Sequence, residues 1–188
     1  MRRRTTLGLL TAAVAGCTGS EPTPTMTDGG TALSLTSPAF DDGATIPSKF
    51  TCDGADRSPE LAIGGVPQGT EAFALLVDDP DAPSAAPFVH WVLFDVPGDT
   101  RTIPGDVPTG DRVTSLDGAG QGRNGFGSLG YRGPCPPRGD GPHTYRFRLF
   151  ALDAMTGLDP GATRDELLGA VENHTVARTT LTGTYERA

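Results

Sequence analysis

Residues 72–96 read AFALLVDDPDAPSAAPFVHWVLFDV, and they carry the clearest structural signal in the chain. Residues 72–77 are a continuous apolar run, and residues 88–96 are a second run that is mostly apolar. Short apolar runs bounded by Pro, Asp and Gly are typical of buried β-strands. We therefore predict two strands separated by a turn. Strict alternation gives the second strand two faces, one with His90, Val92 and Phe94 and the other with Val89, Trp91 and Leu93.

Two more elements are predicted towards the C-terminus. Residues 144–152 alternate, and the alternation separates two sets of side chains: Tyr145, Phe147 and Leu149 on one face, Arg146 and Arg148 on the other. Thr163 and Glu166 have the spacing of a helix capping box. Helical spacing then continues through Leu167, Leu168, Val171 and Thr175. A helix of this length includes His174, which we interpret as a structural residue.

Length and composition indicate a single domain. The chain has 188 residues, of which 26 are Gly and 17 are Pro, so turns and extended segments should outnumber long helices. No apolar segment reaches the roughly 18 residues of a membrane-spanning helix, which excludes a polytopic membrane protein. We expect residues 33–188 to form a mainly β domain, an antiparallel β-sandwich with one or two small helices near the C-terminus.

The charge balance is acidic, with 23 acidic and 15 basic residues and a formal net charge of −8. Because no basic stripe is available to neutralise phosphates, we do not expect a nucleic-acid partner. Lys49 is the single lysine. A carboxylate-rich surface with almost no lysine is typical of a halophilic protein, since salt screens the self-repulsion. The alternative is a GC-rich genome that encodes Arg in place of Lys.

The N-terminus has the pattern of an export signal. Residues 2–4 are arginines, residues 5–15 are mildly apolar, and small residues precede Cys17 as in a lipobox. We predict a lipoprotein-type signal peptide at 1–16, lipid attachment at Cys17, a flexible tether at 17–32 and a position on the outer face of the cell membrane. The paired arginines also resemble a twin-arginine signal. The alternative is a chance run of arginines and alanines.

Three polar motifs interrupt the apolar pattern. They are Asp78–Pro83 directly after the first strand, His90-Trp91 in the second, and the segment 130–139 followed by His143 and Tyr145. Nine glycines lie between Gly118 and Gly141, so this stretch is either a disordered loop or a backbone that passes close to another group. Taken singly, each motif has an ordinary structural explanation as a turn, a core histidine or a loop.

Together the motifs resemble the phosphatidylethanolamine-binding protein family, in particular its bacterial and archaeal Raf kinase inhibitor-like branch. The resemblance covers about residues 34–187. The matching residues are Asp79-Pro-Asp-Ala-Pro83, His90-Trp91, Gly130-Tyr-Arg-Gly-Pro-Cys-Pro-Pro137 and His143-Thr-Tyr145, with further agreement at Phe50-Thr-Cys-Asp-Gly54, Ser58-Pro59, Asn124-Gly-Phe-Gly127 and Phe150-Ala-Leu-Asp153. The family fold is an antiparallel β-sandwich, which agrees with the strand pattern.

The resemblance implies a small anion pocket at one end of the sandwich. The pocket residues carried over from the family are Asp79, Asp81, His90, Gly133, Pro134, His143 and Tyr145. The carboxylates would raise the pKa of a nearby imidazole, so that His90 or His143 donates charge-assisted hydrogen bonds to phosphoryl oxygens. Backbone N–H groups around Gly133 and Cys135 would add an anion-binding concavity.

Cys52 and Cys135 are the two cysteines of the predicted domain. In an exported protein they can pair, and the pair would pin the glycine-rich segment to the first motif. The alternative is two free, buried thiols.

Two classes of function remain. The first is a binding module without catalytic residues, metal or cofactor, which captures a small anionic or phosphorylated ligand such as a lipid head group, with a protease or another protein as a further partner. The second is a phosphoester hydrolase or metal-dependent enzyme that uses His90, His143 and Asp81. A metal would require these three groups to converge on one point.

Overall fold

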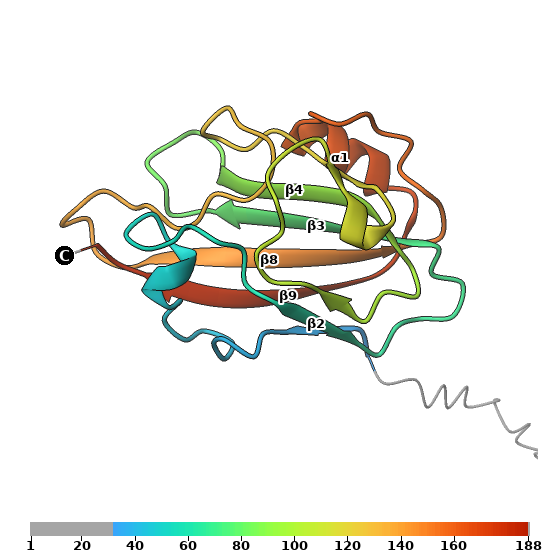
Figure 1. The fold of residues 1–188 in the computed structure, drawn as a ribbon, viewed down its shortest axis with the longest axis horizontal. Coiled ribbons are helices and arrows are strands. Elements are labelled where there is room, and N and C mark those ends of the chain that lie inside the picture. The colour runs from blue at the N-terminus through green and yellow to red at the C-terminus, as the bar shows by residue number, and fades with distance from the viewer. Residues whose placement is uncertain (1–31, 188) are drawn as a thin grey trace, which may run out of the picture.

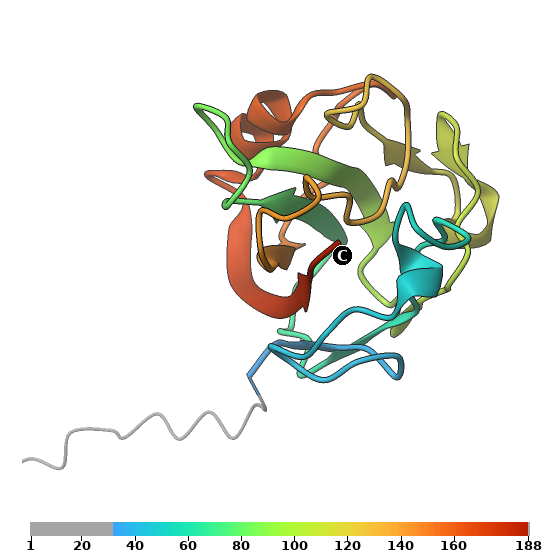
Figure 2. The ribbon, with the colours of Figure 1, turned by 90° about the vertical axis from the view of Figure 1, so that its left-hand side faces the viewer.

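The computed structural model describes residues 32–187 and contains two antiparallel β-sheets (Figures 1 and 2). The smaller sheet has the order β1 (Ser34–Thr36), β2 (Leu61–Gly64) and β5 (Thr102–Ile103). The larger sheet has the order β6 (Arg112–Val113), β7 (Ala119–Gln121), β4 (Phe88–Pro97), β3 (Ala72–Asp79), β8 (His143–Leu152) and β9 (Thr175–Tyr185). The predicted antiparallel β-sandwich is confirmed.

The core lies on both faces of the larger sheet. One face carries the larger cluster, which includes Trp91 and Phe147 and packs against residues of the smaller sheet such as Leu61 and Ile63. The other face is covered by the helix α1 (Arg164–Val171), where Leu167 and Val171 pack on the sheet (Figure 1). Burial of these apolar side chains from water is the main stabilising contribution to the sandwich.

The helix begins as predicted and ends earlier than predicted. The Thr163 hydroxyl accepts a hydrogen bond from the Glu166 N–H, and the Glu166 carboxylate accepts one from the Thr163 N–H, which completes the capping box. Thr175 is the first residue of β9 and not part of the helix. His174 lies in the turn between them, where its Nδ1 is 2.9 Å from the Asp153 carboxylate. Two 3₁₀ turns, η1 (Ser48–Phe50) and η2 (Thr114–Leu116), complete the helical content of residues 32–187.

The predicted face of His90 is wrong, because β4 contains a β-bulge. Val77 of β3 pairs with Trp91, but its neighbour Asp78 pairs with Val89, so His90 is the extra residue. Strict alternation would place His90 with Val92 and Phe94 beneath α1. The bulge turns the His90 side chain to the opposite face instead, because an inserted residue shifts the alternation by one position.

The C-terminus and the start of the described chain lie at opposite ends of the molecule (Figure 1). β3 ends at the same end as the C-terminus. Figure 2 looks directly at the end that holds the C-terminus. Within residues 32–187, no helix has the length and hydropathy needed to cross a membrane. Residues 1–31, which contain the predicted signal peptide and Cys17, lie outside the described residues.

Candidate functional site

A pocket of about 340 Å³ lies where β3 ends and where β4 and β8 begin. Antiparallel neighbours bring these three strand ends to one edge, so residues far apart in sequence meet there. The pocket is lined by Asp79, Ala82, Pro83, Ser84, Phe88, His90, Phe126, Cys135, Pro136, Pro137 and His143. A larger hollow of about 680 Å³ lies between α1 and β9, and none of the predicted site residues lines it.

Asp79 and His143 form a buried ion pair in the pocket wall. Nδ1 of His143 donates to Oδ2 of Asp79 at 2.8 Å, and both side chains are 4% exposed. The other oxygen of Asp79 accepts the N–H groups of Asp81 and Ala82 at 2.8 and 3.1 Å. The turn that follows β3 therefore fixes the carboxylate, and the carboxylate fixes the ring.

His143 is the histidine of the site whose surroundings favour the protonated ring. Burial by itself would lower its pKa, but the hydrogen bonds and charges of Asp79 and Asp140 outweigh burial and raise it above 6.5. Nε2 contacts the Asp140 carboxylate at 3.3 Å, which is a long contact to a side chain that is 50% exposed. A ligand oxygen can replace Asp140 at this nitrogen without breaking the Asp79 pair.

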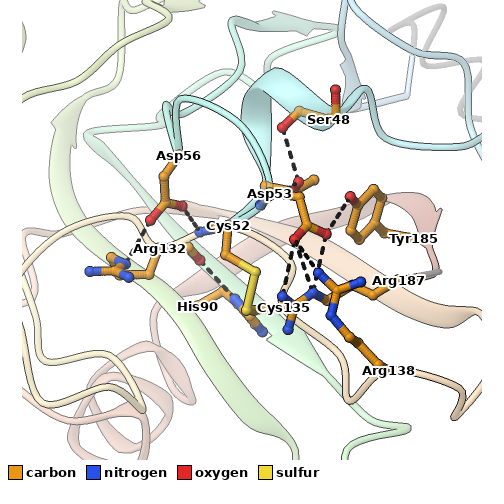
Figure 3. Close-up of a disulfide and its surroundings, with 12 residues drawn as sticks. Ser48, Cys52, Asp53, Asp56, His90, Arg132, Cys135, Arg138, Tyr185 and Arg187 are labelled. Carbon is orange, nitrogen blue, oxygen red and sulfur yellow. Dashed lines mark hydrogen bonds and ion pairs between the residues drawn. A yellow bond between two sulfur atoms is a disulfide. The ribbon is translucent and has the colours of Figure 1, made fainter.

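His90 has the opposite character. Its Nδ1 lies 2.7 Å from the carbonyl oxygen of Arg132, and this contact is visible beside the disulfide in Figure 3. Because a carbonyl oxygen only accepts, Nδ1 carries the proton. Burial lowers the pKa of His90 below its ordinary 6.5, even though the Arg132 carbonyl and the Asp79 charge act against burial. The ring therefore favours its neutral form. Of the two histidines expected to be protonated beside the carboxylates, His143 agrees with that expectation and His90 does not.

Tyr145 lies behind His90 with their ring centroids 5.1 Å apart and edge to face. Its side chain is fully buried and does not line the pocket. Burial, and then the charge of Asp79, raise the pKa of Tyr145 far above its usual range, so the hydroxyl keeps its proton. Of the predicted site residues, Tyr145 therefore packs behind the pocket wall and supports the His90 ring.

The remaining wall of the pocket is aromatic. Phe88 and Phe126 stand edge to face at 4.9 Å, and each also contacts the His90 ring, at 5.4 and 5.7 Å. Gly125 lets the loop approach, because a Cβ at this position would lie 2.6 Å from the Phe88 ring. Phe88 is partly buried and Phe126 is exposed, so the rings form an apolar wall that borders solvent.

The other predicted site residues lie next to the pocket without lining it. Asp81 Oδ2 accepts the Thr144 N–H at 2.7 Å, which fixes the turn after β3 to the start of β8. The Gly133 N–H donates to Asp56 at 2.7 Å, and the Pro134 carbonyl accepts from the Cys52 N–H at 3.1 Å. The predicted anion-binding concavity therefore lacks the Gly133 N–H, which is already bonded within the protein.

The segment 131–135 is tied to the loop after η1. A disulfide joins Cys52 to Cys135, which settles the alternative left open by the sequence. Around it, Asp56 accepts from Arg132 Nε at 2.8 Å, and Asp53 accepts from Tyr185 and Arg187 (Figure 3). A Cβ on Gly133 would lie 2.1 Å from the Phe50 carbonyl oxygen, so only glycine permits this approach. Through Cys135 and the two prolines that follow, these contacts hold one wall of the pocket.

No group of three or more His, Cys, Asp or Glu side chains within residues 32–187 could hold a metal ion. His90, His143 and Asp81, the trio required by the enzymatic alternative, are each bonded to a different protein group. The convergence that a metal site needs is not present in the part of the chain that the structure describes.

The site residues missed from the sequence include Asp140, which reaches Nε2 of His143, and the two rings of the aromatic wall, Phe88 and Phe126. The sequence held a signal for Asp140 and Phe126. Asp140 precedes His143 by three positions in a turn flanked by glycines, and Phe126 belongs to the Asn124–Gly127 motif.

The two pocket histidines are expected to titrate on opposite sides of 6.5, with His143 above and His90 below, for the reasons given above. Protonated His143 stabilises the fold at low pH, and this contribution is lost as the pH rises through its folded pKa. Neutral His90 stabilises the fold above 6.5, and this contribution is lost as the pH falls. An NMR titration of the imidazole signals, assigned with His90→Gln and His143→Gln, measures the order. The reverse order would contradict the tautomer and charge assignments.

Comparison with known proteins agrees with the fold described above. Residues 36–186 match the family model of the phosphatidylethanolamine-binding protein. A UPF0098 protein of Methanothermobacter thermautotrophicus is 46% identical over 155 residues, which span 82% of this chain and 99% of that relative. A UPF0098 protein of Aquifex aeolicus is 43% identical over 160 residues, spanning 85% of this chain and 91% of that relative.

Two solved structures share the fold. Escherichia coli YbcL, described as a member of the mammalian phosphatidylethanolamine-binding protein family, has a TM-score of 0.77 and 32% identity, covering 84% of this chain and 100% of that chain. A phosphatidylethanolamine-binding protein homologue of Chlamydia trachomatis has a TM-score of 0.75 and 34% identity, covering 84% and 99%. The sequence match and the shared fold lead to one conclusion: this chain belongs to the phosphatidylethanolamine-binding protein family.

Proposed function

We propose that this protein is a binding module that captures a small phosphorylated ligand in the pocket between β3, β4 and β8, and that it does so on the outer face of the cell membrane. The observation that carries the proposal is the His143 ring in the pocket wall, whose Nδ1 is paired with Asp79 while its Nε2 has only a long contact to Asp140. When protonated, this ring can donate a charge-assisted hydrogen bond to a phosphoryl oxygen.

The position on the membrane rests on the sequence of the first residues. Arginines at 2–4, the apolar stretch at 5–15 and Cys17 have the order of a lipoprotein signal. We propose that a lipid on Cys17 holds the domain at the cell surface. Mass spectrometry of the protein from membranes tests this, because a lipid-modified N-terminal Cys17 adds mass and an unmodified chain does not.

A calorimetric titration tests the pocket. The full chain carrying Cys17→Ser is titrated with inorganic phosphate, phosphoethanolamine and ethanolamine in concentrated KCl. We expect heat from the two phosphorylated compounds and none from ethanolamine. His143→Gln should weaken phosphate binding by about 10- to 100-fold, because a hydrogen bond to a charged group contributes about 1.5–3 kcal/mol.

His174→Gln is the matched control. His174 also pairs with an aspartate, at 2.9 Å from Asp153, but it lies in the turn before β9 and does not line the pocket. Phosphate affinity should not change in this variant. Equal losses in the two variants would contradict a specific role for His143, and no heat from either phosphorylated compound would contradict the proposal itself.

A further inference from the structure

The hydrogen-bonding groups of the pocket differ in whether they donate or accept, and this difference restricts the ligand. We propose that the pocket selects an oxyanion that carries its own acidic proton. The ligand is then inorganic phosphate or a phosphomonoester in its singly protonated form, and sulfate and phosphodiesters are rejected. This inference rests on the proposed function and adds the chemical class of the ligand.

His90 supplies the acceptor. Its one side-chain hydrogen bond within residues 32–187 joins Nδ1 to the Arg132 carbonyl oxygen, so Nδ1 holds the proton. In the neutral ring Nε2 then carries a lone pair and no hydrogen. The Arg132 N–H also donates to the His90 carbonyl at 3.0 Å, so backbone contacts on both sides hold the residue. His90 lines the pocket, so we assign its acceptor nitrogen to the bound ligand.

His143 supplies the donor. Its Nε2 has only the long contact to Asp140. A donor beside an acceptor matches an oxyanion that has both a bare oxygen and a P–OH group. The P–OH hydrogen is donated to Nε2 of His90, and a bare oxygen accepts from His143.

The charges around the pocket favour the same protonation state. Asp79 lines the wall, and Asp81 and Asp140 lie at its rim. Among the lining side chains only His143 can balance these charges by taking up a proton, and the Arg132 guanidinium over the Phe126 ring is already paired with Asp56. A second negative charge on the ligand would face these carboxylates at short range. A fully deprotonated oxyanion would also place an oxygen lone pair against the lone pair of His90.

The test compares anions of similar shape that differ in their protons. The full chain carrying Cys17→Ser is titrated calorimetrically at about pH 6.5, where a phosphomonoester with a second pKa of about 6 is still partly protonated. The probes are methyl phosphate, dimethyl phosphate, sulfate and glycerophosphoethanolamine. Methyl phosphate should bind at least about 100-fold tighter than sulfate or dimethyl phosphate, because a site built to pair a hydroxyl rejects analogues that lack it.

Each outcome has a distinct meaning. Sulfate or dimethyl phosphate within about threefold of methyl phosphate would overturn the proton requirement and leave the proposed function intact. Binding of glycerophosphoethanolamine alone would show that an ammonium group supplies the donor, which also overturns it. No binding of any oxyanion would overturn the proposed function as well.

A variant removes the acceptor. His90→Phe keeps a ring among Phe88, Phe126 and Tyr145 but has no Nε2, so the ratio of methyl phosphate to sulfate affinity should fall by about tenfold or more. His174→Phe should leave the ratio unchanged. An unchanged ratio in a folded His90→Phe protein would contradict the role of His90. If His90→Phe fails to fold, the comparison of methyl phosphate with sulfate and dimethyl phosphate on the Cys17→Ser chain still tests the proton requirement.

Discussion

Removal of the disulfide with Cys52→Ala and Cys135→Ala is expected to lower the free energy of unfolding by about 4.5 kcal/mol. The two cysteines are 83 residues apart, so the bond closes a long loop and removes much of the entropy of the unfolded chain. The native contacts around the bond remain, including the Gly133–Asp56 hydrogen bond, and they do not replace this restriction of the unfolded state.

Urea unfolding of the double variant and of the parent chain, both with Cys17→Ser, measures the difference. The melting temperature should fall by roughly 10–18 °C, since each kcal/mol corresponds to about 2–4 °C in a domain of this size. The parent chain treated with a reducing agent is the control and should behave like the double variant. A loss below about 1 kcal/mol would mean that the unfolded chain is already compact across this loop.

The second large effect is expected at Asp78. This carboxylate is 0% exposed in β3 and accepts both Nε and Nη2 of Arg146, at 2.8 and 2.9 Å, and Nη1 of Arg148 at 3.2 Å. Asp78→Ala leaves two guanidinium groups without their buried counter-ion. Loss of one partner of a buried pair costs about 3–5 kcal/mol, and we expect about 3 because both arginines keep some contact with water.

Asp165→Ala is the matched control for this variant. Asp165 pairs with Arg164 at 2.7 Å, but its side chain is 85% exposed. Its removal should change stability by less than about 1 kcal/mol, because exposed ion pairs contribute little. Thermal unfolding of both variants compares them directly. Equal effects at the two positions would contradict the view that burial makes the Asp78 pair important.

The strands around the pocket could be predicted from the sequence because their apolar patterns are strong. The runs at 72–77 and 88–96 became β3 and β4, and the alternation of Tyr145 and Phe147 against Arg146 and Arg148 is the pattern seen in β8. Side chains buried on both faces leave few other conformations for such segments.

The orientation of His90 could not be predicted, because a bulge leaves no mark in the pattern of apolar residues. It depends on how β4 pairs with β3, and a shift of one position moved His90 from the α1 face to the pocket face. The preference of His90 for its neutral form could not be predicted from the sequence either. Its neutrality follows from burial and from the Arg132 carbonyl, and both appear only in three dimensions.

β9 was missed because its sequence, TVARTTLTGTY, has few apolar residues. It lies at the edge of the larger sheet and pairs with β8 along its whole length, so backbone hydrogen bonds fix it where side chains give little signal. The segment also follows a well-capped helix, and Thr175 happens to continue the helical spacing. The sequence reading therefore extended the helix past Val171.

The pocket forms where β3 ends, and that end of β3 lies opposite the place where the described chain begins (Figure 1). If Cys17 carries the lipid proposed above, the chain enters the domain at the end opposite the pocket. The pocket would then face the surrounding medium, and dissolved compounds would reach His90 and His143 more readily than the head groups of the anchoring membrane would.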